Sequence, residues 1–274
     1  METLLEQIRR AELEPLRSHF PSDARVLELG GGSGFQASIL SSWRCDVRSI
    51  DVATRPDPVS QRYGRQYFAV TTYDGRAIPF AESSFDVVYT SHMLQAVELT
   101  SMLAEISRVL RPGGVAIHVL PSASWRFWTT LAHYPNLVRK LLTRPRLSSK
   151  VSGHSESAHE ASPQEFPDAP GQTSPGETSQ QGLSPQRPSR LGRARLLLTV
   201  RPVGPSSDVI VEWSSFSKRR WRAAFLAAGF RDVKANRGPL FYTGHLMTPD
   251  LPFGLRSLLA YALGPASFAW TMHR

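Results

Sequence analysis

The first part of the chain alternates between amphipathic stretches and short apolar runs. Three stretches place apolar residues at helical spacing and predict helices: residues 2 to about 19, 35–43 and 98–110. Four apolar, mostly β-branched runs predict buried strands: residues 25–29, 45–51, 85–89 and 115–120. Strands that alternate with helices in this way predict a parallel sheet with helices on both faces.

The pattern is interrupted between residues 144 and 195. This segment is dense in Ser, Pro, Gly and Gln, and Phe166 is its only aromatic residue. Such a composition buries too little apolar surface to offset the entropy of ordering, so we predict a disordered insertion. It serves either as a tether or as a regulatory or docking segment. The pattern resumes with a strand at 209–213, a helix at 218–228 and two further candidate strands, which would complete the same sheet.

A glycine-rich turn follows the first predicted strand, with the spacing Gly30-x-Gly32-x-Gly34. Closely spaced glycines let a ligand approach the backbone and its free N–H groups at the start of the next helix. The dinucleotide fingerprint lacks its third glycine because position 35 is Phe, and no Gly-Lys-Ser/Thr follows that would make a P-loop. Asp51, at the end of the second strand, can accept two hydrogen bonds from ribose hydroxyls. Turn and acid together indicate a nucleoside site, or else a plain strand–helix turn with a capping Asp.

Four motifs stand in register along residues 22 to about 121: VLELGGGSG, SIDV, YDGRAIPFAESSFDVV and EISRVLRPGG. Their order and spacing resemble those of the class I S-adenosylmethionine-dependent methyltransferases, most closely the type 11 group. A weaker likeness returns at AAFLAAGF, between Trp221 and Phe230. The resemblance implies a Rossmann-like, doubly wound α/β fold with a mostly parallel seven-stranded sheet. Residues 1–143 would then be the cofactor-binding part, and residues 196–274 would complete the same domain.

The resemblance also implies a role for each matching residue in binding S-adenosyl-L-methionine. Gly31 stands where the family pattern frequently has a cysteine, and it keeps the turn open. The glycine motif would cradle the methionine and ribose parts, Asp51 would bind the ribose, and Asp74 would accept from the adenine amino group. The full set of implied cofactor-binding residues is Glu28, Gly30, Gly31, Gly32, Gly34, Asp51, Val52, Asp74, Gly75 and Ser91, with Thr90 beside Ser91 at the methionine end.

Methyl transfer from a sulfonium needs few fixed catalytic groups, because the leaving group is good and the protein chiefly positions the acceptor. His92 follows the fourth strand and is the candidate general base; the alternative is a histidine that caps the next helix. His245, with Tyr242, is a second candidate, or part of a buried aromatic segment. His118 alternates within a predicted buried strand and reads as a hydrogen-bonded core residue.

Other polar residues are expected to stabilise the fold and to take no part in binding or catalysis. Asp86, at a strand start, is expected to support the fold. Glu105 and Arg108, three residues apart on one helix, are expected to form an ion pair. The single cysteine, Cys45, excludes an internal disulfide and any metal site built from several cysteines.

The distribution of charge along the chain indicates which class of partner the protein binds. The formal net charge is +9, yet residues 1–143 carry 15 basic against 14 acidic residues, whereas residues 196–274 carry 10 against 4. The excess near the C-terminus favours an anionic acceptor or peripheral contact with an anionic membrane surface, and no specific nucleic acid is expected. The aromatic and leucine-rich stretch from 125 to 142 fits a lid over an apolar acceptor, a helix on a membrane surface, or a packed helix.

The sequence thus predicts a methyltransferase acting on a small-molecule, lipid or glycan-type acceptor. The alternatives are an RNA methyltransferase and an inactive protein that only binds S-adenosylmethionine. No metal site is predicted. Because the charged N-terminus does not read as a signal peptide and no run of 18 apolar residues occurs, we expect a cytoplasmic protein.

Overall fold

The computed structural model describes residues 2–52, 65–142, 216–244 and 251–274. The predicted strand at 209–213 and the predicted insertion at 144–195 lie outside these residues. The helices are α1 (Leu4–Leu13), α2 (Phe35–Ser42), α4 (Leu99–Val109), α5 (Ala123–Leu142), α8 (Lys218–Ala227) and α9 (Phe253–Leu263), with short 3-10 helices η1 (Glu14–His19) and η2 (Leu94–Ala96). The strands are β1 (Arg25–Leu29), β2 (Asp46–Val52), β3 (Val70–Tyr73), β4 (Phe85–Ser91), β5 (Leu110–Pro121), β6 (Arg231–Arg237) and β7 (Ser267–His273).

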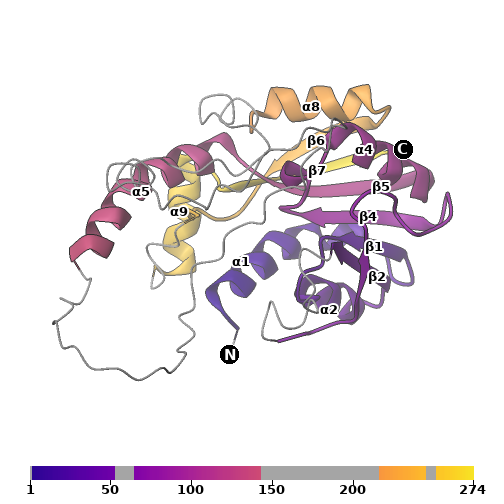
Figure 1. The fold of residues 1–274 in the computed structure, drawn as a ribbon, viewed down its shortest axis with the longest axis horizontal. Coiled ribbons are helices and arrows are strands. Elements are labelled where there is room, and N and C mark those ends of the chain that lie inside the picture. The colour runs from indigo at the N-terminus through magenta and orange to yellow at the C-terminus, as the bar shows by residue number, and fades with distance from the viewer. Residues whose placement is uncertain (1, 53–64, 143–215, 245–250) are drawn as a thin grey trace, which may run out of the picture.

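The strands form one seven-stranded sheet in the order β3-β2-β1-β4-β5-β7-β6 (Figure 1). The pairs β3–β2, β2–β1, β1–β4 and β4–β5 are parallel, whereas β7 runs antiparallel to both β5 and β6. The predicted doubly wound, mostly parallel sheet is therefore confirmed. Strands from the last part of the chain, β6 and β7, join the sheet beside β5.

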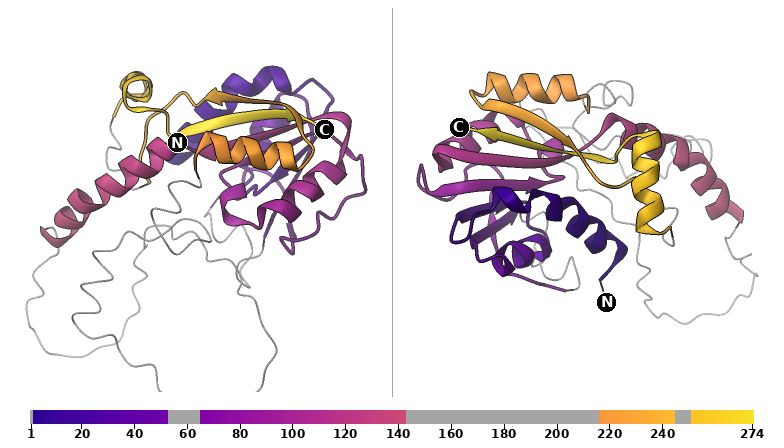
Figure 2. Two further views of the ribbon diagram at one scale, coloured as in Figure 1. Left: turned by 90° about the horizontal axis from the view of Figure 1, so that it is seen from above. Right: turned by 180° about the vertical axis from the view of Figure 1, so that it is seen from behind.

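Helices cover both faces of the sheet (Figure 2). On one face, α4 and α8 bury Ile106 and Phe225 against alternate strand residues such as Leu27. On the other face, η1 and α2 pack Leu16 and Leu40 against the alternate strand residues that point to that side, such as Val26. The alternation of side chains along each strand thus supplies two apolar layers, as expected for a parallel sheet that is buried on both sides.

The N-terminal helix is shorter than its pattern predicted. Thr3 and Glu6 form a capping box that starts α1, the Thr3 hydroxyl accepting from the backbone N–H of Glu6. The predicted helix to about residue 19 instead passes into η1 after Leu13, with Pro15 in its first turn. Proline has no N–H to donate and its ring crowds the preceding turn, which ends the regular α-helix there.

Of the remaining elements, the predicted helices at 35–43 and 98–110 agree closely with the structure, whereas β3 was not predicted and β5 starts early. The predicted helix at 98–110 is α4, which ends at Val109, and β5 begins at once at Leu110, earlier than the predicted 115. The apolar run at 255–263, to which no element was assigned above, lies within α9. A short apolar run without a clear period fits a helix or a strand equally well, so the pattern could not assign it.

Helices α5 and α9 lie beyond the end of the sheet where the carboxyl end of β4 is found (Figure 1). The indole N–H of Trp128 in α5 donates to the carbonyl of Leu263 at the end of α9, at 3.1 Å. Large apolar side chains are exposed on both helices, at Phe127, Leu131 and Leu258 among others. None of the helices in the described parts of the chain is long and apolar enough to cross a membrane.

Candidate functional site

The glycine turn lies at the carboxyl end of β1. The backbone N–H groups of Gly30 and Gly31 both donate to the carbonyl of Ile50 on β2, at 2.8 and 3.2 Å. The N–H of Gly34 donates back to Gly31 at 2.8 Å, which closes the turn before α2 begins. Gly30, Gly32 and Gly34 have φ of +79°, +56° and +74°, a left-handed conformation that side chains strain. The backbone conformation therefore favours glycine at all three positions.

Asp51, at the end of β2, is fixed beside this turn. Its Oδ2 accepts from the backbone N–H of Gly32 at 2.9 Å, and its Oδ1 accepts from the N–H of Val52 at 2.7 Å. The side chain is half-buried. A carboxylate oxygen has more than one acceptor position, so both oxygens can also accept from hydroxyl groups of a ligand. The structure thus brings together Asp51 and the glycine turn, as predicted.

Glu28 lies behind the turn and is buried, with 2% of its surface exposed. Its Oε2 accepts from the Ser49 hydroxyl at 2.6 Å. Burial, reinforced by the nearby negative charge of Asp51, raises the pKa of Glu28 to about 7, although the hydrogen bond from Ser49 opposes the shift. A Cβ built on Gly31 would overlap the Ser49 Oγ and lie 2.8 Å from Glu28 Oε2. Glu28 and Ser49 therefore fill the space into which a side chain at position 31 would extend.

Val52 and Gly75 lie against each other where β2 and β3 end. Val52 pairs with Tyr73 in the parallel ladder. Gly75 has φ of +76°, and a Cβ built there would lie 2.7 Å from Val52 Cγ1. The absence of a side chain at Gly75 leaves one face of Val52 in close contact with backbone. The residues implied for the adenine side are thus neighbours in the structure.

Asp74 is exposed and organises the turn after β3. Its Oδ1 accepts from the backbone N–H groups of Arg76 and Ala77, at 2.8 and 3.1 Å. Such a turn fixes the direction of the carboxylate through its own backbone. Asp74 therefore lies beside Gly75, as the motif implied, at the same end of the sheet as Asp51.

The end of β4 forms the other side of the site. The Thr90 hydroxyl is hydrogen-bonded to His118 Nδ1 at 2.9 Å within the core, so its side chain is engaged away from the site. Ser91 is the last residue of β4. Met93 lies over the glycine turn, since a Cβ on Gly30 would meet the Met93 Cβ at 3.0 Å. The motifs did not indicate this contact by Met93.

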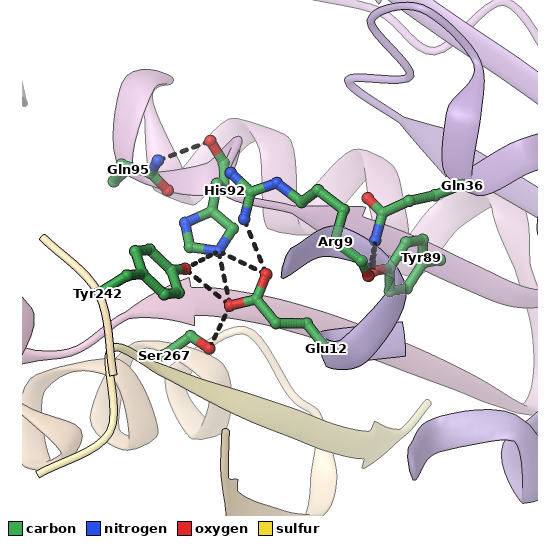
Figure 3. A network of polar contacts seen from close by, with 8 residues as sticks. All are labelled: Arg9, Glu12, Gln36, Tyr89, His92, Gln95, Tyr242 and Ser267. Carbon is green, nitrogen blue, oxygen red and sulfur yellow. Dashed lines mark hydrogen bonds and ion pairs between the residues drawn. The ribbon is translucent and has the colours of Figure 1, made fainter. Parts of the chain in front are cut away.

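His92 joins a buried polar network (Figure 3). Its backbone has φ of +53°, and its backbone N–H donates to the carbonyl of Val119 at 2.8 Å. Its Nε2 lies 3.3 Å from Glu12 Oε2 and 3.4 Å from the Tyr242 hydroxyl. The ring therefore contacts α1 and the C-terminal part of the chain, and within the described residues it makes no hydrogen bond to the helix that follows. The helix-capping alternative for His92 is thus not what the structure shows.

Glu12 is the centre of this network. The side chain is 1% exposed and accepts from Arg9 at 2.8 Å, from the Tyr242 hydroxyl at 2.7 Å and from the Ser267 hydroxyl at 2.5 Å. Burial alone would raise the pKa of Glu12, but His92, Arg9 and the hydroxyl donors hold it far below its usual range. Sequence reasoning missed this residue. The available signal was an acid four positions after Ile8, on the apolar side of the helix.

Several other predicted roles can be located. Asp86 accepts from the Arg25 backbone N–H at 2.7 Å and pairs with Arg111 at 2.9 Å, which supports a structural role at the opposite end of the sheet. Glu105 and Arg108 form the predicted ion pair, with an N–O distance of 2.8 Å. His245 lies outside the described residues. No group of three or more His, Cys, Asp or Glu residues in the described ranges could hold a metal ion.

Comparisons with known proteins find similar sequences. Residues 27–118 match the family described as a methyltransferase domain. The demethylmenaquinone methyltransferase of Beutenbergia cavernae is 37% identical over 107 residues, which are 39% of this chain and 43% of that protein. A malonyl-[acyl-carrier protein] O-methyltransferase of Herminiimonas arsenicoxydans is 34% identical over 89 residues, which are 32% of this chain and 34% of that protein.

Similarity in structure extends further than similarity in sequence. The crystal structure of a SAM-dependent methyltransferase from Archaeoglobus fulgidus has a TM-score of 0.52 and 13% identity, and the match covers 98% of this chain and 94% of that one. At this identity the match establishes the fold alone. The matches cover less than half the length of either of these two curated relatives. The part that matches the methyltransferase domain family contains the glycine turn and strands β2 to β4.

Proposed function

We propose that this protein, whose residues 27–118 match a methyltransferase domain, is a class I methyltransferase that transfers the methyl group of S-adenosylmethionine to a small-molecule, lipid or glycan-type acceptor. The observation that carries the proposal is the position of the Asp51 carboxylate. Its Oδ2 lies 2.9 Å from the backbone nitrogen of Gly32, beside the glycine turn. A half-buried acid beside a glycine turn at the carboxyl ends of parallel strands suits the ribose of a nucleoside.

The residues present fit this cofactor. A side chain at Gly30, Gly31 or Gly34 has no room, since a Cβ at each position would lie within 3.0 Å of Met93, Ser49 or Phe68 respectively, so the turn keeps a bare backbone. In the proposed mode the turn cradles the methionine and ribose parts and Asp51 binds the ribose hydroxyls. Glu28, buried behind the turn, acts as its support and not as a direct ligand.

The adenine and methionine ends are assigned to the two flanking strand ends. Val52 and Gly75 form the surface for the adenine ring, and the carboxylate of Asp74 accepts from its amino group. Ser91, at the end of β4, lies on the methionine side. These assignments rest on the contact between Val52 and Gly75 and on the fixed turn at Asp74.

The cofactor supplies an electrophilic methyl group on a good leaving group, so the protein has mainly to align the acceptor and exclude water. An in-line displacement requires the acceptor atom to lie on the far side of the methyl group from sulfur. The residues available on the methionine side are Ser91, His92 and Met93, which lie at and just after the end of β4. They are the residues of this chain that would border the acceptor.

The acceptor class is inferred from the surface beyond the sheet. Apolar side chains are exposed on both α5 and α9: 47% of Phe127, 62% of Leu258 and 83% of Tyr261. This favours an apolar acceptor, or one drawn from a lipid surface. The names of the two curated relatives refer to demethylmenaquinone and to malonyl-[acyl-carrier protein], so the acceptor is not common to the similar proteins.

Two measurements test the proposal. Isothermal titration calorimetry with S-adenosylhomocysteine is expected to show one site per chain; no binding at millimolar ligand would refute the cofactor assignment. Cell extracts are then incubated with the protein and methyl-labelled S-adenosylmethionine, and the label is followed by mass spectrometry. Label on a small molecule, lipid or glycan supports the proposed acceptor class, and label on RNA refutes it. Binding without transfer to any fraction would identify an inactive binding protein.

A further inference from the structure

Three distant parts of the chain converge on His92 and its partner Glu12. Glu12 comes from α1, Tyr242 from the segment before α9, and Ser267 from the start of β7 (Figure 3). All four side chains are buried or nearly so; the His92 side chain keeps 9% exposure and that of Glu12 1%. An ionisable group is costly to bury unless it is paired, so this cluster requires a defined pattern of protons.

The hydrogen bonds of the cluster determine that pattern. The Tyr242 hydroxyl has one proton and donates it to Glu12 Oε1 at 2.7 Å. The carboxylate can only accept, and the lone pairs of the Tyr242 oxygen also accept. Nε2 of His92 therefore faces acceptors alone, at 3.3 to 3.4 Å, and must carry the proton. In the neutral ring Nδ1 is then the nitrogen with the free lone pair, and it points away from Glu12 (Figure 3).

The charges around the ring favour its neutral form. Three titratable groups face it: Arg9 and Glu12 from α1, and Tyr242. Burial and the Arg9 charge lower the pKa of His92, and they outweigh the opposing effect of the Glu12 carboxylate. A neutral imidazole with one nitrogen anchored is the form that can take up a proton at physiological pH.

The backbone places His92 next to a residue that contacts the glycine turn. His92 has φ of +53° and directly precedes Met93, whose Cβ lies over Gly30. A left-handed conformation at a residue with a side chain is unfavourable and persists only where the surroundings impose it. His92 is therefore the chain neighbour of the residue that contacts the turn.

We propose that His92 accepts the proton released by the methyl acceptor, and that Glu12 is the positioning residue that anchors its Nε2–H. This inference rests on the proposed function. The lone pair of the acceptor's O–H or N–H group forms a bond to the methyl carbon, the carbon–sulfur bond breaks and its electron pair stays on sulfur, and the acceptor's proton moves to Nδ1. The resulting imidazolium faces the Glu12 carboxylate, which stabilises the new charge.

The proton pattern is tested by NMR on the full chain labelled with ¹⁵N-histidine, which needs no acceptor. For wild-type protein at pH 7.5 we expect a neutral His92 with its proton on Nε2. Glu12→Gln, whose amide can donate to Nε2, is expected to shift the proton to Nδ1, while Glu14→Gln, a change at an exposed acid two residues further along the chain, leaves the His92 signals unchanged. A wild-type ring that is protonated on Nδ1, or cationic, overturns the proposal.

The catalytic step is tested with the extract fraction that takes label from the wild-type protein. His92→Gln is expected to lower transfer by about 100-fold or more, with unchanged affinity for S-adenosylhomocysteine. Glu12→Gln is expected to move the acidic limb of the pH–rate profile to lower pH, because the Glu12 charge raises the pKa of His92. If Glu12 had only a structural role, Glu12→Gln would lower the rate equally at every pH. Glu12→Asp would then not restore the wild-type pH–rate profile.

The outcomes separate the two proposals. If the protein binds no cofactor, the proposed function fails while the NMR result still reports the proton pattern. If cofactor binds and label is transferred, but His92→Gln keeps the full rate, the role of His92 is refuted alone. Should Glu12→Gln fail to fold, the wild-type tautomer and the His92→Gln rate remain decisive.

Discussion

Ser49 occupies the space that a side chain at Gly31 would need. A Cβ on Gly31 would overlap the Ser49 hydroxyl oxygen, which is held in place by its 2.6 Å hydrogen bond to Glu28. The glycine that replaces a frequent family cysteine is thus matched by a serine on the neighbouring strand. The two positions are coupled through a contact that spans β1 and β2.

This contact predicts a coupling free energy. Gly31→Ala is expected to destabilise the protein by about 1–3 kcal/mol, the usual cost of overpacking a filled site. Ser49→Ala removes the overlapping oxygen, so the double variant should lose less than the sum of the two single variants. Urea denaturation of all four proteins measures the coupling. Gly254→Ala, with no atom within 4 Å of the added Cβ, is the control and should not destabilise.

Asp51→Ala is expected to weaken binding of S-adenosylhomocysteine by about 1–3 kcal/mol, the range for loss of a hydrogen bond to a charged group. The variant also releases the N–H groups of Gly32 and Val52 that the carboxylate now accepts from. Calorimetry measures the change. Asp46→Ala, at the exposed start of the same strand, is the control. Equal affinity for the Asp51 and Asp46 variants would rule out Asp51 as a ribose ligand.

Glu28 predicts a stability difference that grows with pH. Its pKa is raised to about 7 in the folded protein from 4.5 in the unfolded chain. Between these values the folded state holds the extra proton, so stability falls as pH rises through this window. Glu28→Gln removes that loss, and its advantage should reach about 3 kcal/mol above pH 7. Denaturation at pH 5 and pH 8 measures it, with the exposed Glu82→Gln as control; a pH-independent difference would contradict the assignment.

His118 predicts the opposite trend in acid. Burial lowers its pKa to about 3 from 6.5, so the unfolded chain binds the extra proton between these values. The folded protein is therefore not penalised by His118 above pH 6.5, and its free energy of unfolding falls as pH drops from 6.5 toward 3. His118→Gln, which can keep the hydrogen bond to Thr90, should therefore show a shallower loss of stability below pH 6.5. Thermal unfolding between pH 4 and pH 7 tests this, and the exposed His273→Gln should retain the wild-type slope.

The segment rich in Ser, Pro, Gly and Gln predicts tolerance to deletion. Removing residues 148–192 is expected to leave the affinity for S-adenosylhomocysteine unchanged, because no cofactor residue is assigned to it. Calorimetry on the shortened chain measures this. A large loss of affinity would show that the segment contributes to the cofactor site.

The sequence by itself determined what depends on neighbours along the chain. The strand before Gly30, the turn that only glycine accommodates and the acid at Asp51 are each specified within a few residues, and their order fixes the parallel strands β1, β2 and β4. Helix α4 likewise follows from its own apolar spacing. Local backbone preference and periodicity suffice for such features.

The tertiary structure alone decided what depends on contacts between distant segments. Glu12 accepts from Ser267, 255 positions away, and from Tyr242, and no local pattern links these residues to His92. The steric overlap between a Cβ added at position 31 and the Ser49 hydroxyl likewise exists only once β1 and β2 pair. A buried carboxylate becomes stable only when its donors are brought around it, so its role exists in the folded protein and not in any segment of the sequence.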